Sequence, residues 1–142
     1  MIIKWKTHLL FISLLVMVGV VTQGCASFEK NSKLDALELS LNDFRKAIRW
    51  GYYESAAQHI RQKKYDKPLH DPTYLKNIRI TSYEYGVRQF SEDGNRVTVT
   101  AHISYYDVDR GTVHSTSEKQ NWWFDPESKR WFLDGDIPDL KI

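Results

Sequence analysis

Cysteine is almost absent from this chain of 142 residues, since Cys25 is the only one. An intramolecular disulfide is therefore excluded. A large net charge is also lacking: the chain has 20 Lys and Arg residues and 18 Asp and Glu residues, and no basic block stands out. A chain without a basic patch has little to attract a phosphate backbone, so nucleic acid is not an expected partner. Internal repeats and low-complexity segments are missing as well, which leaves ordinary globular architecture.

Sequence motifs for common catalytic chemistry are missing too. The glycines are isolated, so no phosphate-binding loop is predicted, and no serine sits in a Gly-x-Ser-x-Gly elbow. No two of the histidines after residue 24 lie three to five residues apart, as metal ligands on one element often do; they are His59, His70, His102 and His114. His102 and His114 could meet across a hairpin, but two ordinary surface histidines are the favoured interpretation. We expect no metal, no cofactor and no catalytic residue that sequence alone identifies.

The N-terminal segment contrasts with the polar remainder of the chain. Residues 1–8 carry Lys4 and Lys6 and no acid, and Leu9–Val21 is almost wholly apolar. At 13 residues this run is too short to cross a bilayer core, which needs about 20. A basic head, a short apolar core and small residues after it are typical of a secretory signal peptide. An apolar helix of a soluble domain is disfavoured because nothing polar breaks the run into a stripe.

The residues after the apolar run sharpen this interpretation. Gly24-Cys25-Ala26-Ser27 resembles the lipobox of bacterial lipoproteins, although Thr22 stands where that motif usually has leucine. The resemblance implies that the Cys25 thiol is acylated and that the signal peptide, residues 1–24, is removed between Gly24 and Cys25. Cleavage by ordinary signal peptidase is the competing outcome. It would leave a lone exposed thiol, whereas acylation consumes the thiol.

The lipoprotein resemblance also implies a location in the cell. Lipid attached at Cys25, palmitate included, would hold the chain on a membrane, since two or more acyl chains anchor a protein stably. Ala26 in place of Asp implies, by the sorting rule of Gram-negative lipoproteins, the outer membrane facing the periplasm. Residues 25–33 would then be the lipidated cysteine and a short polar tether, and residues 34–142 a single domain. Because Lys4 and Lys6 leave with the signal peptide, the mature chain has a formal charge near zero.

The first part of the domain has the periodicity of helices. Apolar residues recur every three or four positions at Leu34, Leu37, Leu41, Phe44 and Ile48. Ser32 with Asp35 suggests a capped start, and Gly51 suggests the end of this helix. A second helix is predicted over Tyr52–Gln62, and Pro68 and Pro72 favour an irregular segment after it.

From residue 76 onward the periodicity changes to two, which predicts strands. We expect strands over 78–90, 96–106, 112–124 and 130–134, with a bulge near Thr81-Ser82 and a hairpin turn at Asp93-Gly94. Val87 is expected on the apolar face of the first strand. In the second strand Val97, Val99, Ala101, Ile103 and Tyr105 should share one face. The whole pattern predicts an α+β domain in which two N-terminal helices pack on a curved four-stranded antiparallel meander.

This order of elements resembles the nuclear-transport-factor-2-like (NTF2-like) superfamily, in which a curved sheet wraps an N-terminal helix into a cone. The closing segments Trp122-Trp123-Phe124 and Arg130-Trp131-Phe132-Leu133 carry the resemblance. Some members are enzymes, such as ketosteroid isomerases and polyketide cyclases, and others bind ligands or partners. The enzymes usually have a further strand and helix before the long strands, for which residues 66–77 leave little room. The resemblance therefore implies a small or open pocket, and no catalytic residue carries over.

Aromatic residues with polar groups give the most specific hint of function. The residues of this candidate ligand or partner surface are Tyr83, Tyr85, His102, Tyr106, Trp122 and Trp123. Trp122 and Trp123 are neighbours in a strand and should point to opposite faces. We expect a membrane-anchored periplasmic binding or interaction module, with a homodimer or envelope protein contacting the sheet face. The alternatives are a small-pocket isomerase or cyclase acting on a hydrophobic molecule, and an accessory subunit of an envelope assembly.

Overall fold

The computed structural model describes residues 29–63 and 68–141. The predicted signal peptide, Gly24 and Cys25 lie outside these ranges. The sheet belongs to the compact unit Ala36–Ile142. Residues 29–50 are helical. The elements that follow are α2 (Tyr53–Ala57), the 3-10 helix η1 (Pro72–Asn77), β1 (Ile78–Phe90), β2 (Arg96–Asp107), β3 (Val113–Asp125) and β4 (Arg130–Leu133). The strands pair antiparallel in the order β1-β2-β3-β4, which confirms the predicted α+β class and meander.

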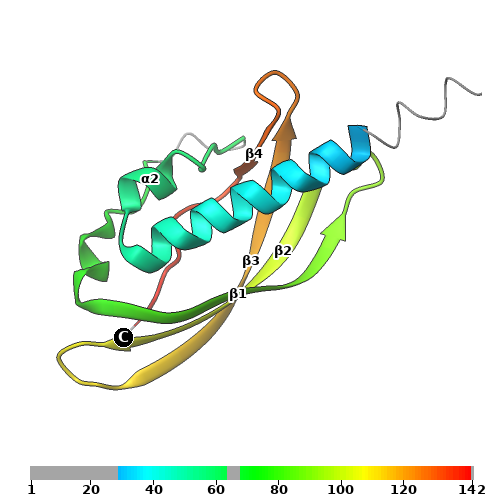
Figure 1. Cartoon of the computed structure of the whole chain (residues 1–142). Helices are drawn as coiled ribbons and strands as arrows, with labels where there is room; N and C mark the ends of the chain where they lie inside the picture. Colours follow the sequence, from blue (N-terminus) through cyan, green and yellow to red (C-terminus); the bar gives the residue numbers. More distant parts are fainter. Residues whose placement is uncertain (1–28, 64–67, 142) are drawn as a thin grey trace, which may run out of the picture. The chain divides into compact units, whose positions relative to one another are not determined.

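Helical residues 36–50 lie across one face of the curved sheet (Figure 1). We call this the inner face and the opposite one the outer face. Leu37, Leu41, Phe44 and Ile48 are at most 1% exposed and form the buried side of this helix, as predicted, but Leu34 of the predicted stripe is 36% exposed. The helix ends as predicted at Gly51, whose φ of 75° belongs to the left-handed region that glycine adopts without strain.

Two predictions for the helices are wrong. Ser32 lies inside the helix rather than at its start, because residues 29–31 are already helical. The second helix ends at Ala57 instead of Gln62. The backbone after it pairs with the sheet: His59 O accepts a hydrogen bond from Leu133 N, and Arg61 N donates one to Leu133 O. These bonds supply the partners that the open edge of β4 would otherwise lack, and they override the helical pattern.

The first strand carries two irregularities. The register shift between Ile80 and Ser82 confirms the predicted bulge, but a second shift between Tyr85 and Arg88 was not predicted. It turns Val87 outward, where the side chain is 67% exposed, so the prediction that Val87 faces inward is wrong. Gly86 lies inside this second shift, and a Cβ there would come within 2.8 Å of His102 Nε2. A larger residue would push the histidine aside.

The second strand has the predicted alternation throughout. Its inward residues are at most 4% exposed, namely Val97, Val99, Ala101, Ile103 and Tyr105. The alternate residues, Thr98 to Tyr106, are exposed or partly buried on the outer face. Trp122 is paired with Val97 and is 1% exposed, whereas Trp123 is paired with Arg96 on the outer face. The prediction that the two tryptophans point to opposite faces is confirmed.

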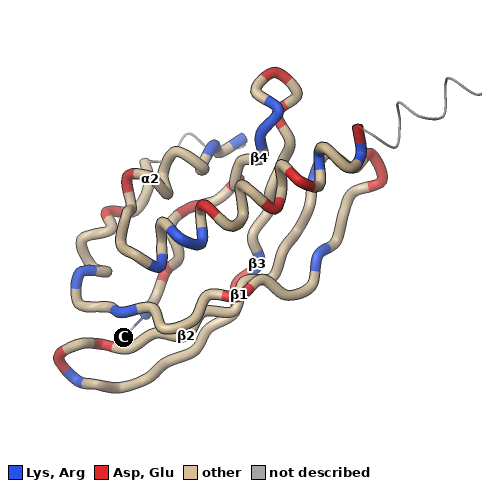
Figure 2. The backbone as a smooth tube through the Cα atoms, in the orientation of Figure 1, with Lys and Arg blue, Asp and Glu red and all other residues tan. Residues whose placement is uncertain are grey.

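Basic and acidic residues are interspersed along the described chain (Figure 2). Several join the helix to the edge strand β1: Arg88 pairs with Glu38, and Arg45 Nη1 lies 3.7 Å from Glu84 Oε2. Within residues 29–63 and 68–141, no helix is both long and apolar enough to span a membrane.

Candidate functional site

The six residues of the predicted aromatic surface divide between the two faces of the sheet. Tyr83, Tyr85 and Trp122 point to the inner face, because they pair with Ile103, Ala101 and Val97. The other three residues, His102, Tyr106 and Trp123, belong to the outer face. Strand geometry forces this division, since successive side chains alternate between faces. The six residues therefore contribute to two separate regions, not one.

The inner region is a hydrogen-bonded cluster centred on Gln120. Its Nε2 donates to Tyr83 Oη at 2.7 Å and to Glu118 Oε1 at 2.6 Å. Its Oε1 accepts from Trp122 Nε1 at 3.4 Å. The Tyr85 ring packs edge-on against that of Tyr83, and its buried hydroxyl lies close to the Tyr83 side chain. This cluster is the polar part of an otherwise apolar interior.

Glu118 is the acidic member of the cluster. Burial raises the pKa of its carboxyl, and the charge of Asp139 adds to this, while the hydrogen bond from Gln120 works against it. The carboxyl lines a cleft of about 220 Å³ that also includes His70 and Asp136. Sequence reasoning missed Glu118 because its environment depends on the C-terminal segment, far away in the chain.

The C-terminal residues after β4 help to form this cleft. Tyr74 Oη donates to Pro138 O and Tyr105 Oη donates to Lys141 O, both at 2.6 Å. Burial raises the pKa of Tyr74 to about 12, so this donor keeps its proton at physiological pH. His70 Nδ1 lies 3.1 Å from Asp136 Oδ2. These contacts hold residues 136–141 against the domain, and the segment limits the access of water to Glu118.

The raised pKa of Glu118 predicts a pH dependence of stability. The folded chain holds this proton more tightly than the unfolded chain, so the contribution is fully present below the unfolded pKa of about 4.3. It is lost as pH rises through the folded value. Glu118→Gln should therefore gain unfolding free energy relative to the parent chain between about pH 4 and pH 7.

Urea denaturation across this pH range measures the difference between Glu118→Gln and the parent chain. Glu92→Gln, an exposed glutamate in the β1–β2 turn, is the matched control. Stability curves of Glu118→Gln and the parent chain that stay parallel from pH 4 to pH 7 would contradict the assignment.

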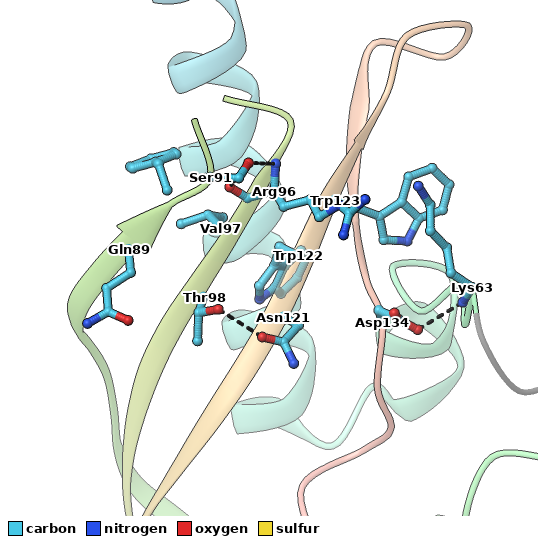
Figure 3. Close-up of a pocket in the computed structure, with 11 residues that line it drawn as sticks. Lys63, Gln89, Ser91, Arg96, Val97, Thr98, Asn121, Trp122, Trp123 and Asp134 are labelled. Atoms are coloured by element: carbon cyan, nitrogen blue, oxygen red, sulfur yellow. Dashed lines mark hydrogen bonds between the residues drawn. The ribbon is translucent and has the colours of Figure 1, made fainter. Parts of the chain in front are cut away.

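The outer region is an open groove of about 710 Å³ where β2 and β3 meet the segment before η1 (Figure 3). We call it the outer groove. Its lining residues are Lys63, Gln89, Phe90, Ser91, Arg96, Val97, Thr98, Asn121, Trp122, Trp123 and Asp134. Its surface combines cationic, anionic, amide, hydroxyl and aromatic groups.

The Trp123 side chain is held in place at the outer groove by several contacts. Its Nε1 donates to Arg61 O at 3.0 Å, and its ring lies 5.6 Å from that of Phe132. The ammonium of Lys63 lies 4.1 Å from the centroid of the Trp123 ring, within the range of a cation–π contact. The indole therefore holds a cation at the rim of the groove.

The remaining outer face is a row of cross-strand polar pairs. Thr98 Oγ1 donates to Asn121 Oδ1 at 2.9 Å, and His102 Nδ1 lies 2.8 Å from Ser117 Oγ. Neither His102 nor Tyr106 lines the outer groove. His114 is the cross-strand neighbour of Tyr105, and the two rings stack on the inner face. His102 lies on the outer face, so the two histidines are not close enough in the fold to act together. In the ranges that the structure describes, no group of three metal-binding side chains is suited to hold an ion.

Of the residues that line the outer groove, Trp122 and Trp123 were predicted, whereas its charged members Lys63, Arg96 and Asp134 were not. These three come from a loop, the start of β2 and the segment after β4, and no spacing in the sequence connects them. Comparisons with known proteins add no assignment: no family model matches the chain, and no curated protein matches it in sequence. A function can therefore be inferred only from the geometry of the domain and from the sequence of the N-terminus.

Proposed function

We propose that the chain is a bacterial envelope lipoprotein whose folded domain, of the NTF2-like type, is a binding module. Acylation at Cys25 holds it on the outer membrane facing the periplasm, and the outer groove contacts its ligand or partner. One observation carries the binding function: the space between the helix and the inner face is filled, while the outer groove is open. Leu37, Leu41 and Phe44 are at most 1% exposed where an enzyme of this type would need a cavity.

The filled interior disfavours an isomerase or cyclase that encloses a hydrophobic substrate. Trp122 occupies the space between helix and sheet, with its ring edge-on to Phe44 at 5.5 Å. Tyr83 is 1% exposed and bonded to Gln120, so its hydroxyl is not presented to a substrate. Substrate entry would require several of these side chains to move together.

A second candidate function, an acid–base enzyme, is favoured by Glu118 alone. A carboxyl with a raised pKa at a cleft has the property that general acids and bases share. The cleft of about 220 Å³ limits this function to a small substrate. Binding through the outer groove remains the proposed function, because that opening is larger and its polar groups are exposed.

Site-directed photo-crosslinking in cells tests the binding function. A photoreactive residue at Asn121, exposed in the outer groove, is compared with one at Lys46, exposed on the helix. We expect a defined adduct on the chain from position 121 and none from position 46, read by mass spectrometry. A second copy in the adduct would identify a homodimer, and another envelope protein an accessory subunit. Absence of a position-specific adduct would contradict the proposal.

A further inference from the structure

We propose that the outer groove recognises a carboxylate-bearing saccharide. The proposal rests on the proposed function of the groove as the binding surface, and it adds the chemical class of the ligand. Three features of the groove carry it: a pair of cations beside an aromatic ring, a carboxylate among those cations, and an open floor made by strand faces.

The cations are Arg96 and Lys63, on elements that adjoin Trp123. Arg96 is the cross-strand partner of Trp123 and is exposed; its guanidinium makes no hydrogen bond among the described residues, although its charge acts on the Asp93 carboxylate. The nearby carboxylate of Asp93 accepts instead from Ser91 Oγ and Asn95 N. Figure 3 shows the Arg96 and Lys63 side chains both reaching toward the Trp123 indole. An exposed guanidinium with unused donors suits the two oxygens of a carboxylate.

Asp134 restricts which anion the groove can accept. Its Oδ1 accepts from Lys63 N at 2.8 Å, so this carboxylate is fixed at the same end of the groove as the Lys63 ammonium. A ligand rich in negative charge, such as a polyphosphate, would be repelled there. A hydroxyl group could donate to Asp134 instead. The amides of Gln89 and Asn121 add donors and acceptors, so the lining suits a molecule that combines hydroxyls with a carboxylate.

The position of the groove disfavours an extended peptide. Its floor is made by β2 and β3, whose facing backbone groups are hydrogen-bonded to each other along the whole register. A peptide that adds to a sheet needs a free row of such groups. The groove instead offers side chains, among them the Trp123 ring on the outer face, against which the apolar face of a sugar ring can pack.

A pair of tetrasaccharides tests the proposal on the whole protein as purified from the membrane fraction, held in detergent micelles. The acidic probe alternates N-acetylglucosamine with N-acetylmuramic acid, and the neutral probe is the N-acetylglucosamine tetramer. They differ only by lactyl groups, each with one carboxyl. Titration calorimetry should show that the acidic probe binds more tightly by about tenfold or more, since a bidentate charged contact is lost with the neutral one.

Variants locate the effect in the groove. Arg96→Gln should remove most of the preference for the acidic probe, and Lys63→Gln should reduce it, because each variant deletes one exposed cation. Lys46→Gln is the matched control: it deletes an exposed lysine of the helix on the other layer and should bind both probes as the parent chain does. Unchanged thermal unfolding of all three variants shows that any loss is local.

Equal affinity for the two tetrasaccharides, or no binding of either, would overturn the saccharide proposal. So would tighter binding of a hexaglutamate peptide, which would assign the groove to acidic polypeptide. In each of these cases a position-specific crosslink from Asn121 would still support the binding module. The failure of the ligand class is thus distinguishable from the failure of the proposed function.

Discussion

Replacing Trp122 by alanine is expected to lower the free energy of unfolding by about 3–5 kcal/mol. The side chain is 1% exposed and packs edge-on against Phe44. Its Nε1 also donates to Gln120 Oε1, so the substitution removes one contact of the inner cluster as well as leaving a cavity. Chemical denaturation followed by circular dichroism measures the loss.

The neighbouring residue supplies the matched control. Trp123→Ala removes the same side chain one position later, on the outer face, where it is only partly buried. It loses the hydrogen bond to Arg61 O and the Lys63 contact, for an expected cost of about 1–2 kcal/mol. Equal losses from Trp122→Ala and Trp123→Ala would contradict the assignment of the two tryptophans to different faces.

Replacing Cys25 by serine is expected to abolish palmitate labelling and to move the chain from the membrane fraction to the soluble fraction. Serine lacks the thiol to which the first lipid of the proposed lipoprotein is attached, and Cys25 is the only cysteine in the chain. Without acyl chains the apolar contribution to membrane binding, about 0.8 kcal/mol per buried CH₂, is lost. Metabolic labelling and ultracentrifugation of lysates measure both effects.

Ser27→Ala is the control for Cys25→Ser, because it changes a small residue of the same segment and leaves the thiol intact. It should keep both the label and the membrane association. Membrane fractionation that persists in Cys25→Ser would contradict the proposed anchor.

The meander was predictable because its signals are local. The alternation along β2 and the Asp93-Gly94 turn depend on neighbouring residues alone, and both have the predicted structure. The end of α2 was not predictable in this way. Residues 58–62 continue a helical pattern, but Leu133 of β4 offers them backbone hydrogen bonds, and a partner so distant in sequence leaves no local signal.

The candidate sites were predictable only in part, for the same reason. The aromatic residues were found from strand parity, which also separated Trp122 from Trp123. Arg96 was predicted as the first residue of one strand and Asp134 as the last residue of another, and only the fold shows that both line one groove. The pKa of Glu118 is raised by burial to which the C-terminal segment contributes, and the sequence of β3 alone does not show that cover.

Anchoring through Cys25 is tested most directly by the intact mass of the protein purified from the membrane fraction. The proposed lipoprotein should lack residues 1–24 and carry acyl groups on an N-terminal Cys25. Fragmentation of the first peptide should place the added mass on that residue. A chain that keeps its N-terminal segment, or that is cut there but has an unmodified thiol at residue 25, would contradict the anchor.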